Sequence, residues 1–156
     1  MALGIASRLK ELGIVLPSPP MGGGNFIPAK TVANIIYLSG VIPTGASGVI
    51  TGTVGSDRTI EEGYAAARVC ALTQLAVLQR YLGGADEALD GVRSILSVNG
   101  YVNAVAGFPD SPKVINGASD VLVEIFGEAG RHVRAAIGVN ALPLHALVEL
   151  QMTVEI

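Results

Sequence analysis

Residues 132–156 read HVRAAIGVNALPLHALVELQMTVEI, and this stretch decides the fold. Two segments in it, about 132–139 and 146–155, alternate between apolar residues and residues of other kinds. This alternation is typical of strands that bury one face. Residues 140–144, which include Pro143, separate the segments as a turn. The stretch therefore predicts two strands of a sheet that has one apolar face and one mixed face.

Arg134 is the unusual residue of the first strand. The odd-numbered residues from Val133 to Val139 are expected on its core face, so Arg134 shares the opposite face with Ala136 and Gly138. Neighbours this small predict a hollow beside the guanidinium, which can hold a planar carboxylate through two parallel hydrogen bonds. A structural ion pair with an Asp or Glu is the alternative, and the pattern alone leaves both open.

Glu149 is the corresponding residue of the second strand. The even-numbered residues from Ala146 to Val154 form an apolar face, and Glu149 lies on the opposite, mixed face with Gln151. A carboxylate in this position could orient a water molecule as a general base. It could equally be the ion-pair partner of Arg134 or a solvated residue at the edge of the sheet.

The rest of the chain predicts two long helices and further strands. Thr59 with Glu62 is a capping box that starts the first long helix, which Gly83 and Gly84 end, and Ser111-Pro112 is typical of the start of the second. The expected helices are 2–13, 60–82 and 111–126, with a helical turn at 86–91, and the other strands are 26–29, 34–39, 49–54 and 92–105. With both long helices on one face of a mixed sheet, the fold is α+β and the other face needs a partner.

Length and hydropathy predict one domain that forms an oligomer. The 156 residues suit a single domain, 1–156, in which residues 1–24 are an N-terminal helix followed by a Pro/Gly loop extension. Mean hydropathy is high, at +0.53, yet no apolar run is long enough to span a membrane. Charged residues interrupt the first sixteen positions, so no signal peptide is expected and the chain is predicted to be cytoplasmic. Burial between subunits is the simplest place for the excess apolar surface.

Charge and the scarce cysteine and histidine exclude several functions. The net charge is −3 and aromatic residues make up 4% of the chain, so nucleic acid is not an expected partner. Cys70 is the single cysteine, which excludes an internal disulfide, and it is expected in the core. His132 and His145 are the only histidines; they are expected at the surface, and no metal site is predicted.

Several of these residues together resemble the RidA/YjgF family of reactive-intermediate deaminases. The segment Asn34-Ile-Ile-Tyr-Leu-Ser39-Gly40, Asn116 in the second long helix, and the spacing from Arg134 through Leu142-Pro143 to Glu149 carry the resemblance, which spans roughly residues 26–156. The N-terminal extension and residues 113–120 are similar to a longer branch, which often carries the label "putative endoribonuclease".

The resemblance implies a chorismate-mutase-like α+β fold and a homotrimer with clefts between subunits. It further implies hydrolysis of 2-imino or enamine acids such as 2-aminoacrylate to 2-keto acids and ammonia, without a cofactor. In this family the arginine matching Arg134 holds the substrate carboxylate, the glutamate matching Glu149 positions water, and residues matching Gly40 and Asn116 line the cleft. The chain departs from the family at two cleft positions, where Phe26 replaces the usual tyrosine and Ala136 the common cysteine.

Two other functions remain open. One is non-catalytic binding of small carboxylates, which would use the same Arg134 clamp without turnover. The other is the ribonuclease action that the label suggests. The acidic balance, the scarce aromatic residues and the lack of a recognisable histidine pair for acid–base cleavage all argue against ribonuclease action.

Overall fold

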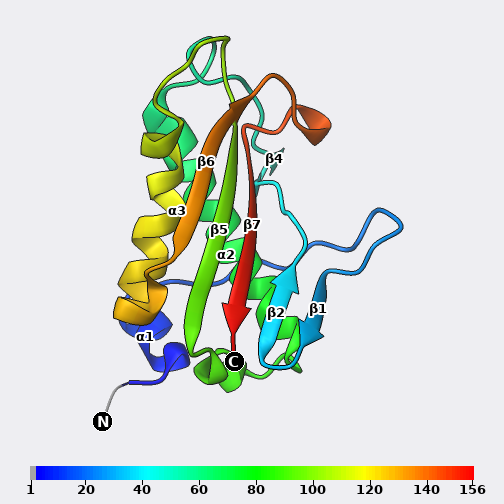
Figure 1. The fold of residues 1–156 in the computed structure, drawn as a ribbon, viewed down its shortest axis with the longest axis vertical. Helices are drawn as coiled ribbons and strands as arrows, with labels where there is room; N and C mark the ends of the chain where they lie inside the picture. Colours follow the sequence, from blue (N-terminus) through cyan, green and yellow to red (C-terminus); the bar gives the residue numbers. More distant parts are fainter. Residues whose placement is uncertain (1–2) are drawn as a thin grey trace.

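The computed structural model describes residues 3–156 as one layer of helices packed on one face of a five-stranded sheet (Figure 1). The sheet has the strand order β1-β2-β7-β5-β6. The helices and turns are α1 (Ile5–Glu11), α2 (Ile60–Tyr81), η1 (Asp86–Gly91), α3 (Ser111–Phe126), η2 (Gly127–Gly130) and η3 (Pro143–His145). The strands are β1 (Ala29–Val32), β2 (Ile35–Leu38), β3 (Thr44–Gly45), β4 (Gly48–Val49), β5 (Ser94–Asn103), β6 (Val133–Val139) and β7 (Val148–Glu155).

The capping box at the start of α2 is confirmed. The Thr59 side chain accepts a hydrogen bond from the Glu62 amide, and the Glu62 carboxylate accepts one from the Thr59 amide, so two amides at the helix start are satisfied. The start of α3 differs from the prediction, because its N-cap is Asp110 and the hydroxyl of Ser111 lies buried with no hydrogen-bond partner. The helix therefore begins at the expected residue but without the expected side-chain cap.

The two long helices cover the same face of the sheet, as predicted (Figure 1). They also pack closely against each other. A Cβ atom at Gly117 of α3 would collide with the backbone carbonyl of Tyr64 in α2, so a glycine is required where the two helices meet. The shared core contains the apolar side of both helices and the helix-facing residues of β2, β5 and β7, including Ile36, Leu38, Leu75, Leu78, Val98, Val102, Ile115, Leu122, Leu150 and Met152.

The strand predictions need three corrections. The first strand is β1, Ala29–Val32, instead of 26–29, and it pairs with β2 across a turn in which Ala33 has a positive φ of 53°. Of the expected strand 49–54, only Val49 belongs to a strand, as the last residue of β4, which pairs with β3. In β5, the alternation that places Val98 and Val102 in the core predicts Leu96 there as well, but a bulge between Ile95 and Ser97 interrupts it, so Ile95 is buried and Leu96 is not.

The edge strand β6 requires the most important correction. Its residues alternate as predicted, but Val133 and Ile137, expected on the core face, are 73% and 49% exposed. Arg134, Ala136 and Gly138 face the helices instead: Ala136 packs against the core, and a Cβ at Gly138 would contact the Ser111 hydroxyl. The small residues are therefore where α3 packs.

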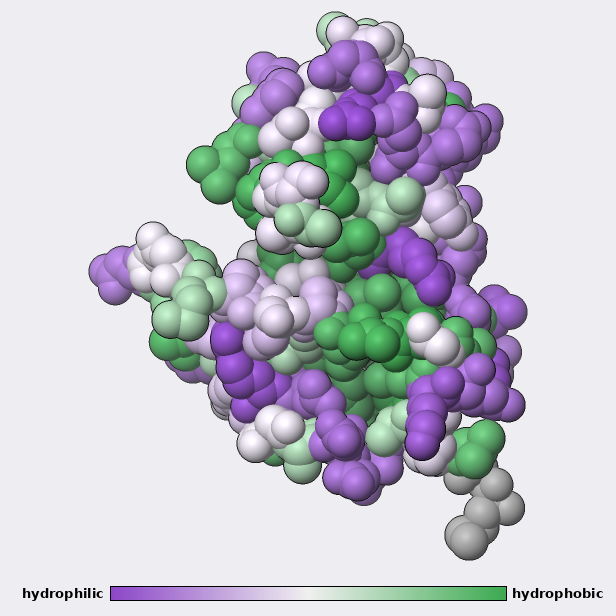
Figure 2. Space-filling model, turned by 180° about the vertical axis from the view of Figure 1, so that it is seen from behind, coloured by the Kyte–Doolittle hydropathy of each residue, from purple (hydrophilic) through white to green (hydrophobic). Residues whose placement is uncertain are grey.

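The N-terminal segment crosses the helix side of the molecule. Leu9 of α1 belongs to the core, and Ile5, Leu12, Ile14 and Leu16 pack against it. In Figure 2, which shows this side, hydrophobic surface is visible across the middle, between hydrophilic groups at the upper right and along the lower edge. Within residues 3–156, no helix is long and apolar enough to cross a membrane.

Candidate functional site

Arg134 reaches from β6 onto the surface of α3. Its Nη1 donates hydrogen bonds to Oδ1 of Asn116 at 2.8 Å and to Oγ of Ser119 at 3.0 Å, and its Nη2 donates to the carbonyl of Pro112 at 3.3 Å. Sequence reasoning grouped Arg134 with Asn116 only through the family resemblance, and the structure places the two in contact. All three acceptors lie on α3, so one helix holds the guanidinium in place.

The charge of Arg134 has no counter-charge within the described chain. None of the ion pairs among residues 3–156 includes Arg134, so the alternative of a structural ion pair is not what the structure shows. A guanidinium has five N–H donors, and the contacts with α3 use three. Among residues 3–156, Nε–H and one Nη2–H are bonded to no acceptor. Two donors on adjacent nitrogens can hold a carboxylate.

His132 belongs to the same cluster, although it was expected at the surface. Its ring is half-buried; Nδ1 lies 2.7 Å from the Gly130 carbonyl and Nε2 lies 2.9 Å from Oγ of Ser119. Burial, with the charge of Arg134 adding to it, lowers the pKa of His132, and the Gly130 hydrogen bond opposes this in part. Burial therefore favours the neutral form of the ring close to the Arg134 guanidinium.

Glu149 lies in β7, near Gly40. It is half-buried in β7, and a Cβ at Gly40 would lie 3.3 Å from the Glu149 carboxyl carbon, so a residue with a side chain at position 40 would press on the carboxylate. Burial raises the pKa of Glu149, and no ion pair within residues 3–156 offsets that burial. Glu149 is thus a partly desolvated carboxylate with a raised affinity for a proton.

A cavity of about 580 Å³ opens beside Glu149. Gly40 and Phe26, both predicted as cleft residues, line it, and Phe26 itself is 57% exposed. Sequence reasoning missed Met21 and Leu144, two exposed apolar side chains that also line this cavity. The exposure of these two apolar side chains could have identified them, but the exposure of a side chain is known only from the folded structure.

The structure separates the predicted residues into two half-sites. The Arg134 half-site contains Asn116, Ser119 and His132, and the Glu149 half-site contains Gly40 and Phe26. Ala136 lies two residues beyond Arg134 on the same face of β6 and packs on the core.

The two half-sites lie on opposite faces of the sheet. In the sheet, Arg134 lies beside Val98 of β5, whose side chain faces the helices. Glu149 lies beside Tyr101 of β5, whose side chain faces away from the helices. Val98 and Tyr101 are three residues apart, which is about 10 Å along β5. Arg134 and Glu149 of one chain therefore cannot meet on one small ligand.

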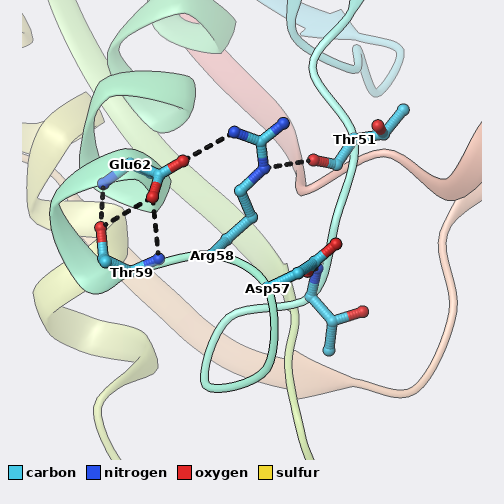
Figure 3. Close-up of polar contacts among 6 residues, drawn as sticks. Thr51, Asp57, Arg58, Thr59 and Glu62 are labelled. Atoms are coloured by element: carbon cyan, nitrogen blue, oxygen red, sulfur yellow. Dashed lines mark hydrogen bonds and ion pairs between the residues drawn. The ribbon is translucent and has the colours of Figure 1, made fainter.

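A second arginine, Arg58, holds the loop at 51–58 against the start of α2 (Figure 3). Its Nη1 pairs with Glu62 at 2.6 Å, and its Nε donates to the carbonyl of Thr51 at 2.9 Å. Asp57 accepts a hydrogen bond from the amide of Thr53, which lowers the pKa of Asp57. These contacts join the loop at 51–58 to the start of α2.

The same loop is paired with the start of the last strand. Thr51 forms a bridge with Ala146, and the Gly52 amide donates to the carbonyl of His145. His145 follows Leu144, which lines the cavity. His145 is exposed, as predicted.

Neither half-site resembles a metal centre. Among residues 3–156, no three His, Cys, Asp or Glu side chains lie close enough together to hold a metal ion. Cys70 is fully buried in α2, as predicted, and burial raises the pKa of its thiol well above the usual value. The chemistry that these residues can support is therefore anion binding at Arg134 and proton transfer at Glu149.

Comparison with known proteins identifies related chains along almost the whole length. A family model described as "YjgF/chorismate mutase-like, putative endoribonuclease" matches residues 6–156. Protein TCP17 of Trypanosoma cruzi is 38% identical over 154 residues, which cover 97% of this chain and 94% of that protein.

Solved structures agree with this match. The crystal structure of a "putative endoribonuclease" from Shewanella oneidensis is 34% identical, with a TM-score of 0.91, and the match covers 99% of this chain and all of that one. An Agrobacterium tumefaciens protein of unknown function is 38% identical, with a TM-score of 0.87, covering 97% of this chain and 92% of its own. RidA from an Antarctic Psychrobacter, at 21% identity and a TM-score of 0.60, shares the fold; this match covers 89% of this chain and 94% of that one.

Proposed function

The chain belongs to the YjgF/chorismate-mutase-like family, and on this premise we propose that it hydrolyses small 2-imino or enamine acids, of the 2-aminoacrylate type, to 2-keto acids and ammonia. The observation that carries the proposal is the state of Arg134, whose contacts within the described chain are all with neutral acceptors. A positive charge held in one orientation and not paired with a carboxylate is suited to binding the carboxylate of a substrate.

Glu149 is the second group that the reaction needs. An enamine acid first tautomerises to its imine. Water then adds to the carbon of the C=N bond while Glu149 takes a proton from the water and passes it to the nitrogen, which gives a carbinolamine. The hydroxyl proton of the carbinolamine then moves to the amino group as the C–N bond breaks, which releases ammonia and leaves the 2-keto acid. The raised pKa of Glu149 makes it a better proton acceptor than an ordinary surface carboxylate. With the carboxylate bound to Arg134, much of the rate enhancement would come from positioning. This scheme needs no cofactor.

The complete site is proposed to form between subunits of a homotrimer. Because Arg134 and Glu149 of one chain face opposite sides of the sheet, the two half-sites must come from different chains to act on one molecule. The exposed apolar residues Tyr37, Val133 and Ile137 on the open face of the sheet supply surface for such contacts. The Arg134 half-site of one subunit would then complete the Glu149 half-site of its neighbour.

Complementation between two inactive variants tests this proposal. Arg134→Ala and Glu149→Gln are each expected to lose hydrolysis of 2-aminoacrylate, generated in situ by a dehydratase and followed as ammonia release. Mixed oligomers made by co-expression should regain activity, because in a random mixture about a quarter of the interfaces combine a native Arg134 with a native Glu149. Arg134→Ala activity equal to that of the native protein would contradict the function. Two inactive variants without recovery on mixing would contradict the shared site.

Two other functions remain as outcomes of the same assay. A non-catalytic carboxylate binder would show Arg134-dependent stabilisation by a 2-keto acid but no ammonia release. Ribonuclease action is the other candidate, because the family description and the Shewanella protein carry that name. RNA cleavage by nuclease-free protein that persists in high salt and disappears in Arg134→Ala would favour it over deamination.

A further inference from the structure

A chain of hydrogen bonds runs from Arg134 to the backbone behind it. Arg134 Nη1 lies 3.0 Å from Oγ of Ser119, which lies 2.9 Å from Nε2 of His132, and Nδ1 of His132 lies 2.7 Å from the carbonyl of Gly130. The links come from β6, α3, the residue before β6 and η2. Only three residues separate Gly130 from Arg134 in the sequence, but the hydrogen bonds between them pass through Ser119 of α3.

The direction of each hydrogen bond follows from the end groups. A carbonyl only accepts, so Nδ1 of His132 carries a proton, and in the neutral ring Nε2 is then an acceptor. Ser119 must donate its hydroxyl proton to Nε2, which leaves its oxygen lone pairs for Arg134. A guanidinium only donates, so every bond points the same way, from Arg134 to Gly130. Hydrogen bonds aligned in this way strengthen one another.

We propose that Ser119 and His132 are positioning residues for Arg134, which hold its guanidinium in the orientation that binds a carboxylate and sense whether the carboxylate is bound. This inference rests on the proposed function and adds two residues to it. Asn116 holds Nη1 from the other side, and the Pro112 carbonyl holds Nη2. A carboxylate that meets the two remaining donors therefore finds an arginine that has already lost much of its side-chain freedom.

Ligand binding should also change the proton affinity of His132. Among the described residues, the charged group that acts on His132 is Arg134, whereas its contacts from α3 and η2, Ser119 and the Gly130 carbonyl, are neutral. Arg134 lowers the pKa of His132, so a carboxylate that offsets the charge of Arg134 should raise it. Because such coupling is reciprocal, the 2-keto acid should bind more tightly when His132 is protonated, and its affinity should fall as pH rises through that pKa.

The first measurement is a pH titration of the imidazole NMR signals of the full oligomeric protein, with and without saturating pyruvate. The chain has only two histidines, so the imidazole signals are few enough to assign with a His132 variant. Pyruvate should raise the pKa of His132 by roughly half a pH unit. An unchanged His132 titration in protein saturated with pyruvate would overturn the coupling.

The second measurement compares variants of Ser119. Ser119→Ala should weaken pyruvate binding and raise KM about tenfold, with kcat within about twofold, because the lost contact holds the group that binds the carboxylate and not the reacting carbon. Ser119→Thr keeps a hydroxyl and should restore most of the affinity. Ser56→Ala, at an exposed turn, is the matched control and should bind as the native protein does. His132→Leu should resemble Ser119→Ala, and if that variant fails to fold, the Ser119 pair decides.

The outcomes separate this inference from the function on which it rests. If native protein binds no pyruvate, or if Arg134→Gln binds it equally well, both fall. A different result overturns only the positioning roles. In that case pyruvate binding depends on Arg134, but Ser119→Ala binds pyruvate as the native protein does and pyruvate leaves the pKa of His132 unchanged. A Ser119→Ala variant that loses thermal stability but keeps its KM would likewise show a merely structural contact.

Discussion

Two arginines of this protein, Arg58 and Arg134, are both held by several hydrogen bonds but differ in what balances their charge. Arg58 pairs with Glu62 and donates to a backbone carbonyl in the loop before α2 (Figure 3). Arg134 donates to an amide, a hydroxyl and a backbone carbonyl, all of them neutral. Both side chains are therefore ordered, but only the Arg58 guanidinium has a carboxylate partner within the described residues.

The difference separates a structural arginine from a candidate binding arginine. A carboxylate partner satisfies both the hydrogen-bond donors and the charge, and nothing further is needed from a ligand. Neutral acceptors satisfy donors and fix the orientation but leave the positive charge available. The two arginines therefore differ in the charge of their hydrogen-bond partners and not in whether they are hydrogen-bonded.

The largest effect is expected for Arg134→Gln. This substitution keeps a polar side chain but removes the charge, so kcat/KM for 2-aminoacrylate hydrolysis should fall by about a hundredfold or more, which corresponds to roughly 3 kcal/mol. Coupled ammonia assays would measure it. The melting temperature should fall only slightly, because the variant loses hydrogen bonds from Arg134 to α3 but no ion pair within the described residues. A stable Arg134→Gln variant with native kcat/KM would contradict the role of Arg134 in binding the substrate.

Glu149→Gln extends the comparison to a carboxylate that lacks an arginine. The variant should lower kcat by roughly ten- to a hundredfold with little change in KM, because it removes proton transfer and leaves the carboxylate clamp intact. Burial raises the pKa of Glu149, so the acidic limb of the native kcat profile should lie above pH 4.5, the ordinary value for Glu. A pH–rate profile measures this, and the limb should vanish in the variant.

The same pKa shift predicts a stability effect of opposite sign to the activity effect. Because the folded state disfavours the ionised form of Glu149, its ionisation weakens the fold as pH rises above the value for the unfolded chain. Glu149→Gln should therefore raise the melting temperature slightly at neutral pH and not at acidic pH. A less stable variant at neutral pH would mean that the carboxylate is satisfied by contacts in the assembled protein.

The smallest effect is expected for Arg58→Gln. Pyruvate affinity should stay near the native value, while the melting temperature falls slightly, because the variant loses the Glu62 pair and the contact with the Thr51 carbonyl. The Arg58 hydrogen bond lowers the pKa of Glu62, so this stabilisation is present above the ordinary carboxyl range and is lost as pH falls through the lowered pKa. Thermal unfolding at neutral and acidic pH tests it, and an equal loss at both would exclude the ion pair as the cause.

Much of the fold follows from local patterns in the sequence. The Thr59/Glu62 capping box and the Ser111-Pro112 pair locate the starts of both long helices, and the alternation in 133–139 and 148–155 identifies two strands. These signals are reliable because they depend on contacts within a few residues. The pairing of Arg134 with Asn116 was available only through family resemblance, since their contact joins a strand to a helix 18 residues away.

Features that depend on distant contacts were predicted wrongly or were missed. The bulge in β5 reverses the positions of Ile95 and Leu96, because an extra residue in one strand shifts which side chains face the core. The cluster of Ser119 and His132 with Arg134 was missed because nothing in the sequence spacing places a helix residue beside that strand.

The sequence by itself determined the two long helices, the two strands β6 and β7, Arg134 as a candidate and its spacing to Glu149. Only the tertiary structure decided that Arg134 faces the helices and Glu149 faces away from them. The physical reason is that a strand pattern of period two states which residues share a face but not which face is covered. That choice depends on where α3 packs, and it places Arg134 and Glu149 in two half-sites on opposite faces of the sheet.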